Sequence, residues 1–307
     1  MRSPNRSERI KAEAIRLGFD DCGITRAEPL PEDHARLLSW LSKGYQADMT
    51  YMDRNIEKRA NPQLLVENAR SVIVVLQNYY PDKTKFKSHY KVAKYAYGED
   101  YHKVLKDKLF TLFKFINLEI APARGRCFTD SAPVMERALA VKAGLGWIGR
   151  NGNLLTRNHG SFVFIAEIIT DLELAYDAPN LRNYCGSCNI CIEQCPTGAI
   201  VSSGVINSHK CISYLTIENK KDIPEAFKGK TDDWIFGCDI CQDVCPWNRK
   251  AVVTSEERFS PKEELISMSD EDWNNLTEKK FNTFFSNSPI SRTGISGIKR
   301  NISFSKV

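Results

Sequence analysis

The sequence predicts an α/β or α+β domain over residues 1–175, a cysteine-rich domain over residues 176–250 and a short helical tail over residues 251–307. Three observations support this division. Apolar segments with helical and strand patterns alternate through the first part of the chain. Eight of the ten cysteines lie between Cys185 and Cys245, and the sequence beyond Asn248 is polar with scattered aromatic residues.

The composition is that of an ordinary globular protein. Among 307 residues, 42% are hydrophobic and 26% are charged, and no apolar segment has the length needed to cross a bilayer. The first residues are basic but lack an apolar core and a cleavage site, so we expect a cytoplasmic protein without membrane association. The net charge of +5 permits an acidic partner such as RNA without demonstrating one.

Helices and strands of the first domain follow from short patterns. Residues 7–18 are expected to form a helix that ends at Gly18, and a second helix ends near Gly44. The continuous apolar segment SVIVVLQ, from Ser71, predicts a strand that is covered on both faces.

The remaining elements of this domain are predicted in the same way. Residues 101–118 form an apolar stripe at helical spacing, carried by Tyr101, Leu105, Leu109, Leu112, Phe113 and Ile116. A strand at 124–130, a helix at 132–144 and a glycine-rich loop at 145–156 follow, and SFVFIAEIIT at 161–170 is another strand.

The cysteine spacing predicts two [4Fe-4S] clusters. A C-x2-C-x2-C-x3-C-P run, typical of bacterial ferredoxins, is formed by Cys185, Cys188, Cys191 and Cys195. A partial repeat, C-x2-C-x3-C-P, contains Cys238, Cys241 and Cys245, and Cys211 lies between the two. Because the fourth cysteine of such a run serves the other cluster, one set is Cys185, Cys188, Cys191 and Cys245. The other set is Cys195, Cys211, Cys238 and Cys241.

An alternative assignment of these cysteines is two structural zinc sites with four thiolates each. Zinc ribbons do not normally contain the ferredoxin run or its repeat, so iron–sulfur clusters are favoured. The two other cysteines, Cys22 and Cys127, are expected to be small buried apolar side chains.

Several segments together resemble epoxyqueuosine reductases. They are CGSCNICIEQCPTGAI, HKCISYLTIE, FGCDICQDVCPWNR, GEDYHKVL and CFTDSAPVMERALAVKAGLGWIGRN. The resemblance spans most of the chain, and the segment SPISRTGISGIKRN is similar to the end of the family's shorter members.

This resemblance implies a cobalamin-binding α/β (α+β) domain followed by a ferredoxin-like domain with two [4Fe-4S] clusters. The implied activity is reduction of epoxyqueuosine to queuosine at the wobble position of tRNA, with electrons passing through the clusters to a base-off cobalamin. A flavodoxin or ferredoxin is the expected electron donor, and a monomer is expected. No D-x-H-x-x-G segment is present, which agrees with cobalamin that lacks a histidine ligand.

The resemblance assigns the role of proton donor to Asp130, in FTDSAPVMER. Such a donor is expected to have a pKa raised by burial. The alternative is that Asp130 caps the helix that follows it. Arg137 is expected either to orient Asp130 or the substrate, or to form a surface ion pair.

Cobalamin contacts implied by the resemblance are Arg59, Asp130, Arg150, Asn151, Ser213 and Asp239. For Arg59 the alternative is a solvated charge in a polar loop. For the glycines between Gly146 and Gly152 it is a tight turn rather than close approach to a cofactor.

Two other functions remain open at this point. A cobalamin-dependent reductive dehalogenase would combine similar parts but is typically exported. An electron-transfer protein without catalytic activity would bind no corrinoid.

Overall fold

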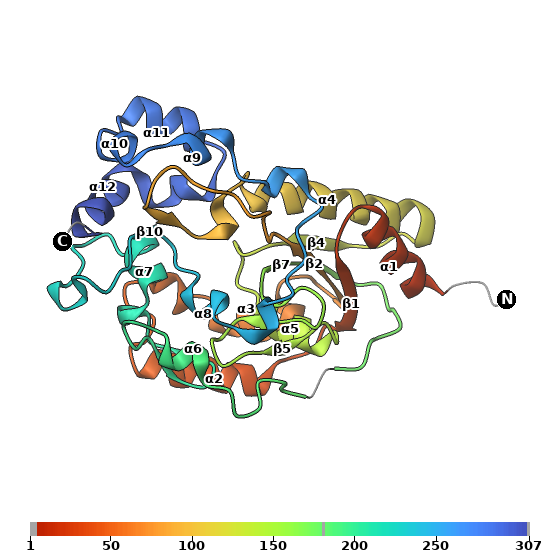
Figure 1. Ribbon diagram of the computed structural model, residues 1–307. Helices are drawn as coiled ribbons and strands as arrows, with labels where there is room; N and C mark the ends of the chain where they lie inside the picture. Colours follow the sequence, from red (N-terminus) through yellow and green to blue (C-terminus); the bar gives the residue numbers. More distant parts are fainter. Residues whose placement is uncertain (1–4, 180–181, 306–307) are drawn as a thin grey trace.

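A computed structural model of the chain describes residues 5–179 and 182–305 (Figure 1). Its largest sheet has four antiparallel strands in the order β1–β2–β7–β4. These strands are β1 (Asp21–Arg26), β2 (Ser71–Asn78), β7 (Val163–Thr170) and β4 (Gly125–Phe128). The strands expected near residues 71, 124 and 161 are confirmed, and their antiparallel pairing favours the α+β class over α/β.

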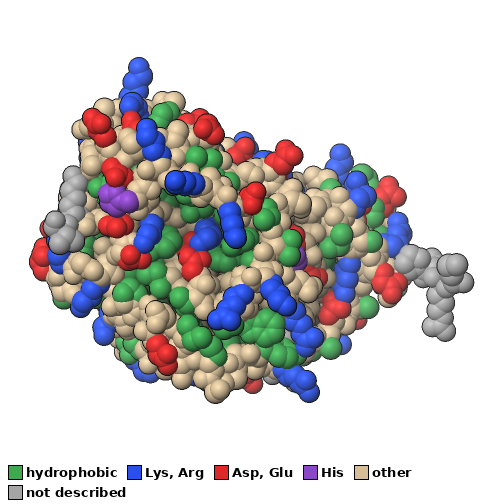
Figure 2. Space-filling view, in the orientation of Figure 1, with side chains coloured by type: hydrophobic (Ala, Val, Ile, Leu, Met, Phe, Trp, Pro, Cys, Tyr) green, Lys and Arg blue, Asp and Glu red, His purple; other side chains and the backbone are tan. Residues whose placement is uncertain are grey.

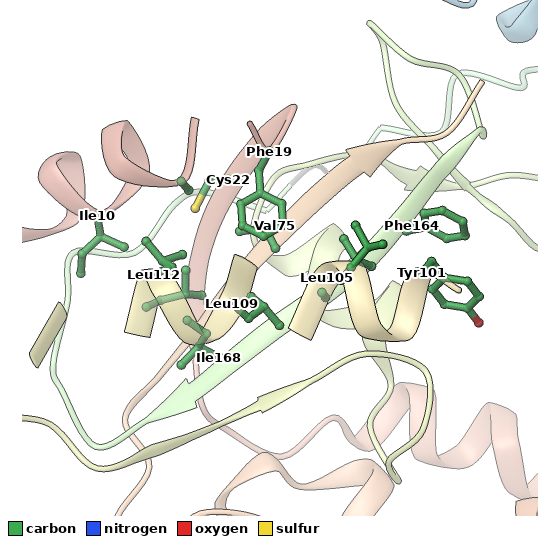
Figure 3. Close-up of a cluster of buried hydrophobic side chains, with 14 of the residues drawn as sticks. Ile10, Phe19, Cys22, Val75, Tyr101, Leu105, Leu109, Leu112, Phe164 and Ile168 are labelled. Carbon is green, nitrogen blue, oxygen red and sulfur yellow. The ribbon is translucent and has the colours of Figure 1, made fainter. Parts of the chain in front are cut away.

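Helices cover both faces of this sheet, which explains the continuous apolar sequence of β2. Ile73 and Val75 pack in one layer with helices α1 and α4. Val72 and Val74 point to the other layer and pack with helix α5. Figure 3 shows the contribution of α4 to the first layer, through Leu105, Leu109 and Leu112. The helix bounds are α1 (Arg6–Arg16), α4 (Tyr101–Phe115) and α5 (Glu136–Lys142).

The beginning of α4 is fixed by a side-chain cap. The carboxylate of Asp100 accepts a hydrogen bond of 3.0 Å from the backbone N–H of His102, and α4 begins at Tyr101. The helix ends at Phe115 and continues as a π-helical turn, Ile116–Ile120. This cap places Tyr101 and His102 in the first turn of a long, buried helix.

The cysteine-rich part contains short elements and is joined to the first part by a strand pair. Its elements are α6 (Ile190–Glu193), β8 (Ile200–Ser202), β9 (Val205–Ile206), α7 (Ile212–Ile217), β10 (Trp234–Phe236) and α8 (Ile240–Asp243). Strand β10 pairs in parallel with β3 (Lys91–Val92), which precedes α4 in the chain. Other short elements of the first part are α2 (Pro31–Ser42), α3 (Ile56–Ala60), β5 (Trp147–Ile148) and β6 (Leu154–Leu155).

In the described part of the tail, up to residue 305, four α-helices pack onto this junction. They are α9 (Glu263–Ser267), α10 (Asp270–Asn274), α11 (Glu278–Phe285) and α12 (Gly294–Ser305). Trp273, Phe281 and Phe285 share one buried apolar cluster with Val92 and Phe236. The tail therefore covers the strand pair that joins the two preceding parts of the chain (Figure 1). Within the described residues, no helix combines the length and the apolar character required of a membrane span.

Candidate active site and iron–sulfur centres

One group of four thiols surrounds a cavity of about 150 Å³. The cysteines that line it are Cys185, Cys188, Cys191 and Cys245. Cys245 reaches this group from the second cysteine run, 54 residues after Cys191 along the chain. A cavity of this size offers room for several atoms between the thiols, rather than for a single ion.

The remaining four thiols influence one another's ionisation. Burial, and then the charges of Cys211 and Cys195, raise the pKa of Cys238. Burial also raises the pKa of Cys241, with contributions from Cys211, Cys238 and Cys195. Because buried thiols resist ionisation and metal ligands are thiolates, metal binding at these positions would release protons.

Backbone N–H groups point at two sulfur atoms of this second group. The N–H of Ala199 lies 3.3 Å from Sγ of Cys195. Backbone hydrogen bonds from Ser213 and Tyr214, in the first turn of α7, favour the thiolate of Cys211. Such donors stabilise negative charge on ligating sulfur atoms.

Cys22 and Cys127 lie outside both groups. Cys22 is buried in the apolar layer beneath α1 and α4, and the half-buried Cys127 packs against the same layer. Burial raises the pKa of each thiol to about 12. Both are therefore apolar packing residues, as predicted.

Asp130 lies in the loop between β4 and α5, with a positive φ of 51°. Its Oδ2 accepts a short hydrogen bond from the hydroxyl of Tyr101 and lies 3.4 Å from Nε2 of His102. The helix that follows is capped by Met135 rather than by Asp130, so the helix-cap alternative is wrong. The Asp130 side chain is 54% exposed, which leaves it accessible to a substrate.

The pKa of Asp130 differs from the sequence-based expectation. Burial does raise it, but hydrogen bonds from His102 and Tyr101 outweigh this effect and lower the pKa below its usual value. The position beside the first turn of α4 also favours negative charge. The expected raised pKa is therefore wrong for this arrangement, and the carboxylate form of Asp130 is favoured.

Two further carboxyl groups lie behind Asp130. Glu136, in α5, accepts a short hydrogen bond from the backbone N–H of Asp130. Burial and the charge of Asp130 raise the pKa of Glu136 to about 8. Glu167, in β7, is fully buried, and its carboxyl oxygens have no hydrogen-bond partner among the described residues. Burial, followed by the charges of Glu136 and Asp130, raises its pKa well above the usual range.

Arg137 does not form the surface ion pair that was one of its two expected roles, and its expected role in orienting Asp130 or the substrate stays a prediction. Its guanidinium donates a short hydrogen bond to the carbonyl oxygen of Gly152, and no described carboxylate forms an ion pair with it. Arg137 therefore braces the glycine-rich loop. A Cβ at Gly146 would collide with the carbonyl oxygen of Leu155, and Gly152 has a φ of 77°, so these two glycines serve the geometry of the loop itself.

Arg59 lies in the first part of the chain, and Ser213 lies in the cysteine-rich part. Arg59, in α3, donates through Nη2 to the carbonyl oxygen of Tyr51 at 3.0 Å. Its Nε is buried and has no acceptor among the residues that the structure describes. Burial lowers the pKa of Arg59, so the guanidinium is not a freely solvated charge. Ser213 is half-buried in α7, two residues after Cys211.

The other predicted contact residues connect the two parts of the protein. Arg150 donates to the carbonyl oxygen of Gly186 at 2.6 Å and to the side chain of Asn189. Asn151 is buried and donates to the carbonyl oxygen of Cys241 at 3.3 Å. Both residues also line the cavity of the first thiol group.

Asp239, between Cys238 and Cys241, is almost fully buried. It accepts a hydrogen bond of 2.8 Å from the backbone N–H of Lys94, and Nζ of Lys94 lies 3.4 Å away. Burial outweighs the lysine and raises the pKa of Asp239 to about 6. The charges of Asp130 and Asp239 both act on Tyr95, which therefore lies within electrostatic range of the Asp130 loop and of the second thiol group.

Sequence reasoning missed several residues around Asp130. Asp100, Tyr101 and His102 belong to the segment GEDYHKVL, but the helical pattern assigns Tyr101 only to the apolar stripe of its helix. Glu167 had a detectable signal, since it is the one acidic residue within SFVFIAEIIT. Arg292, in the tail, had no such signal, although its charge helps to lower the pKa of Asp130.

Comparison with protein families matches two parts of the chain. Residues 184–248 match a 4Fe-4S double cluster binding domain. Residues 59–131, which include Asp130, match the family described as epoxyqueuosine reductase QueG, DUF1730. The chain therefore contains a double-cluster iron–sulfur domain.

Full-length relatives agree with these matches. The epoxyqueuosine reductase of Cellulophaga algicola is 52% identical over 98% of both chains. That of Escherichia coli is 40% identical over 96% of this chain and 79% of its own length. A crystal structure of epoxyqueuosine reductase with a tRNA-Tyr epoxyqueuosine-modified stem loop superposes with a TM-score of 0.90, at 30% identity, over 97% of this chain and 80% of that one.

One solved relative is described by the position of its catalytic loop. A Bacillus subtilis epoxyqueuosine reductase, with a TM-score of 0.89 and 29% identity over 97% of this chain and 80% of that one, is described with its catalytic aspartate loop swung out of the active site. Identity over nearly the full length of the curated relatives is far above what a shared fold alone requires. This chain belongs to the epoxyqueuosine reductase family.

Proposed function

We propose that this protein reduces epoxyqueuosine to queuosine at the wobble position of tRNA, with Asp130 as proton donor. The observation that carries this proposal is the accessible Asp130 carboxyl, held by Tyr101 and His102 in the same chain as the double-cluster domain. Converting an epoxide to an alkene and water consumes two electrons and two protons. The clusters of the cysteine domain would pass on the two electrons, and the Asp130 side chain would donate one of the protons.

The thiol groups support the assignment of eight ligands. We assign Cys185, Cys188, Cys191 and Cys245 to one [4Fe-4S] cluster because they line a shared cavity. The other cluster is assigned the remaining four cysteines, Cys195, Cys211, Cys238 and Cys241. The charges of Cys195 and Cys211 raise the pKa values of both Cys238 and Cys241, which indicates that these thiols are neighbours. A flavodoxin or ferredoxin would deliver electrons to this domain in a monomeric protein in the cytoplasm.

A base-off cobalamin fits the residues that remain available. The buried Nε of Arg59 lacks an acceptor among the described residues, so an amide or phosphate oxygen of the cofactor would satisfy it. Ser213 offers a hydroxyl near Cys211. Arg150, Asn151 and Asp239 already form hydrogen bonds within the protein, and these bonds would hold the wall of the cofactor site in place. When bound, the cofactor supplies a cobalt centre able to deliver electrons to an epoxide carbon.

The charge distribution supports tRNA as the substrate carrier. Lys and Arg side chains gather across the middle of the face shown in Figure 2, with hydrophobic side chains between them. Basic side chains attract the phosphate backbone, and exposed apolar groups support an unstacked base.

Anaerobic turnover tests this function. Protein reconstituted with iron, sulfide and cobalamin is incubated with a reductant and epoxyqueuosine-containing tRNA, and nucleosides are separated after nuclease digestion. We expect queuosine, and none when cobalamin is omitted. Clusters without turnover would contradict the proposal.

The variant Asp130→Asn tests the proton donor. We expect its rate to fall by about 10²–10⁴-fold, because an amide cannot donate the carboxyl proton. Iron content and cobalamin absorption should stay unchanged. Asp171→Asn is the matched control, since this exposed aspartate accepts a backbone hydrogen bond of 2.8 Å from Arg124, outside the Asp130 region. Joint loss of cofactor and activity in Asp130→Asn would indicate a structural role instead.

A further inference from the structure

The imidazole of His102 lies between two carboxylates. Its Nδ1 is 2.8 Å from Oδ1 of Asp100, and its Nε2 is 3.4 Å from Oδ2 of Asp130. A neutral imidazole has one donor and one acceptor nitrogen, whereas an imidazolium has two donors. With an acceptor at each nitrogen, this arrangement favours the protonated ring.

The two carboxylates differ in exposure and in their other contacts. Asp100 also accepts the backbone N–H of His102, so it is fixed by the cap of α4. Asp130 is the more exposed of the two, at 54% against 35%. Tyr101 holds the same Oδ2 that faces His102, and the ring of Tyr101 stacks on the imidazole with centroids 4.1 Å apart. The network of Asp100, Tyr101, His102 and Asp130 therefore has a less exposed end at Asp100 and a more exposed end at Asp130.

We propose that His102, held by Asp100, stores the proton that Asp130 delivers to the epoxide oxygen. This inference rests on the proposed function. The proton moves from Nε2 to Oδ2 as the developing charge on the oxygen increases the demand for an acid, and rotation of the carboxyl group presents it to the substrate. Both C–O bonds of the epoxide break, two electrons arrive through the clusters, and the oxygen leaves as water. The second proton comes from solvent.

The ionisation of the network agrees with this role. Burial disfavours the imidazolium, but the hydrogen bonds and charges of Asp100 and Asp130 outweigh it and raise the pKa of His102 to about 9. The hydrogen bond from His102 is the main cause of the lowered pKa of Asp100. At neutral pH the proton therefore resides on His102, and Asp130 is its immediate acceptor.

Other charged and titratable groups surround the network. The cations that act on Asp100 or Asp130 are Lys106, Arg137 and Arg292. Acidic and phenolic groups that interact with Asp130 are Glu136, Glu167, Tyr51 and Tyr95. Glu136 has a pKa of about 8, and burial raises those of Glu167 and Tyr95 well above their usual ranges, so these groups are mainly neutral at pH 7.

The pH dependence of a single turnover tests the proposal. The wild-type rate should hold until His102 deprotonates near pH 9. In His102→Gln the fall of the rate with rising pH should begin at least about 2 pH units lower than in the wild type, because Asp130 must then take its proton directly from water. The loss at pH 8 should therefore be at least about 10-fold and should shrink at pH 6.

His89→Gln is the matched control. His89 forms the same kind of pair with a carboxylate, since its Nδ1 lies 2.7 Å from Asp270, but it belongs to the segment before β3 and contacts the tail. Its profile should coincide with that of the wild type. The proposal would be overturned if the rate of His102→Gln were lowered equally at every pH and began to fall at the same pH as that of the wild type.

A titration without substrate separates this inference from the proposed function. The imidazole signals of ¹³C-histidine-labelled protein, with His102 assigned from His102→Gln, should titrate near pH 9 and move to lower pH in Asp100→Asn. A neutral His102 at pH 7 would overturn the proposal even if queuosine is formed. Absence of queuosine from the wild type, with His102 titrating near pH 9, would instead count against the proposed function.

Discussion

The cysteine module, Cys185 to Cys245, and the network around Asp130 differ in how their residues are brought together. Seven of the eight module thiols belong to two short runs with fixed spacing, and those runs are recognisable without any fold. Asp100, Tyr101 and His102 begin a helix, whereas Asp130 lies in a loop that follows another element. The cysteine runs are thus encoded locally, whereas the network around Asp130 is assembled by tertiary structure.

The two regions also use burial differently. Burial raises the pKa values of Cys238 and Cys241, and binding of a metal by their thiolates would have to overcome this effect. Around Asp130, burial is opposed by specific partners, so neighbouring acids have opposite tendencies: the pKa of Asp130 is lowered and that of Glu136 is raised. Groups whose environments separate their pKa values are typical of sites that transfer protons.

The largest expected effect tests the pairing between the two cysteine runs. Cys245→Ser should remove the cluster that Cys185, Cys188 and Cys191 help to hold, leaving about half of the iron, and it should abolish turnover. Iron analysis and electron paramagnetic resonance of the reduced protein measure this. Cys185→Ser is the matched variant and should lose the same cluster signal. Different remaining signals in the two variants would show that Cys245 serves the other cluster.

A smaller effect is expected at the joint between the two regions. Lys94→Met leaves the carboxylate of Asp239 buried without its cation, with side-chain exposures of 18% and 4% for the pair. We expect a loss of about 3 kcal/mol in the free energy of unfolding, seen as a lower apparent melting temperature under anaerobic conditions.

Lys91→Met is the control for this change. Lys91 pairs with Asp232 at 2.9 Å, but both side chains are exposed, at 40% and 56%. Its loss should stay below about 1 kcal/mol. Equal losses in the two variants would mean that burial of the Lys94–Asp239 pair has no energetic consequence.

The smallest effect concerns Glu167, behind the Asp130 network. Its pKa is raised in the folded protein from an ordinary value of 4.5, so the wild type loses stability as pH rises above that value. Glu167→Gln has no proton to lose. Its stability relative to the wild type should grow between pH 5 and pH 7, by up to about 1.4 kcal/mol per pH unit.

Denaturant unfolding at several pH values measures this difference. Glu173→Gln is the control, because Glu173 is 63% exposed and pairs with Arg70 at the surface. Its stability difference from the wild type should stay within about 1 kcal/mol at each pH. If the curves of Glu167→Gln and the wild type remain parallel, Glu167 is ionised in the folded protein and has a partner that stabilises its charge.

The sequence by itself determined the elements with strong local patterns. The strand from Ser71, the helix from Tyr101 and the packing role of the tail aromatics follow from periodicity and apolar composition. The double-cluster domain follows from cysteine spacing, because two-residue gaps place successive thiols on one small loop. These features depend on neighbours within a few residues.

Only the tertiary structure decided what Asp130 and Arg137 contact. Asp130 precedes a helix, and sequence rules for caps do not register that Tyr101 and His102 approach it from another element. Arg137 turns to a backbone carbonyl of the glycine-rich loop instead of to a carboxylate. Hydrogen bonds and charges across space set the pKa of a carboxyl group, and their partners are separated along the chain, so no local pattern contains that information.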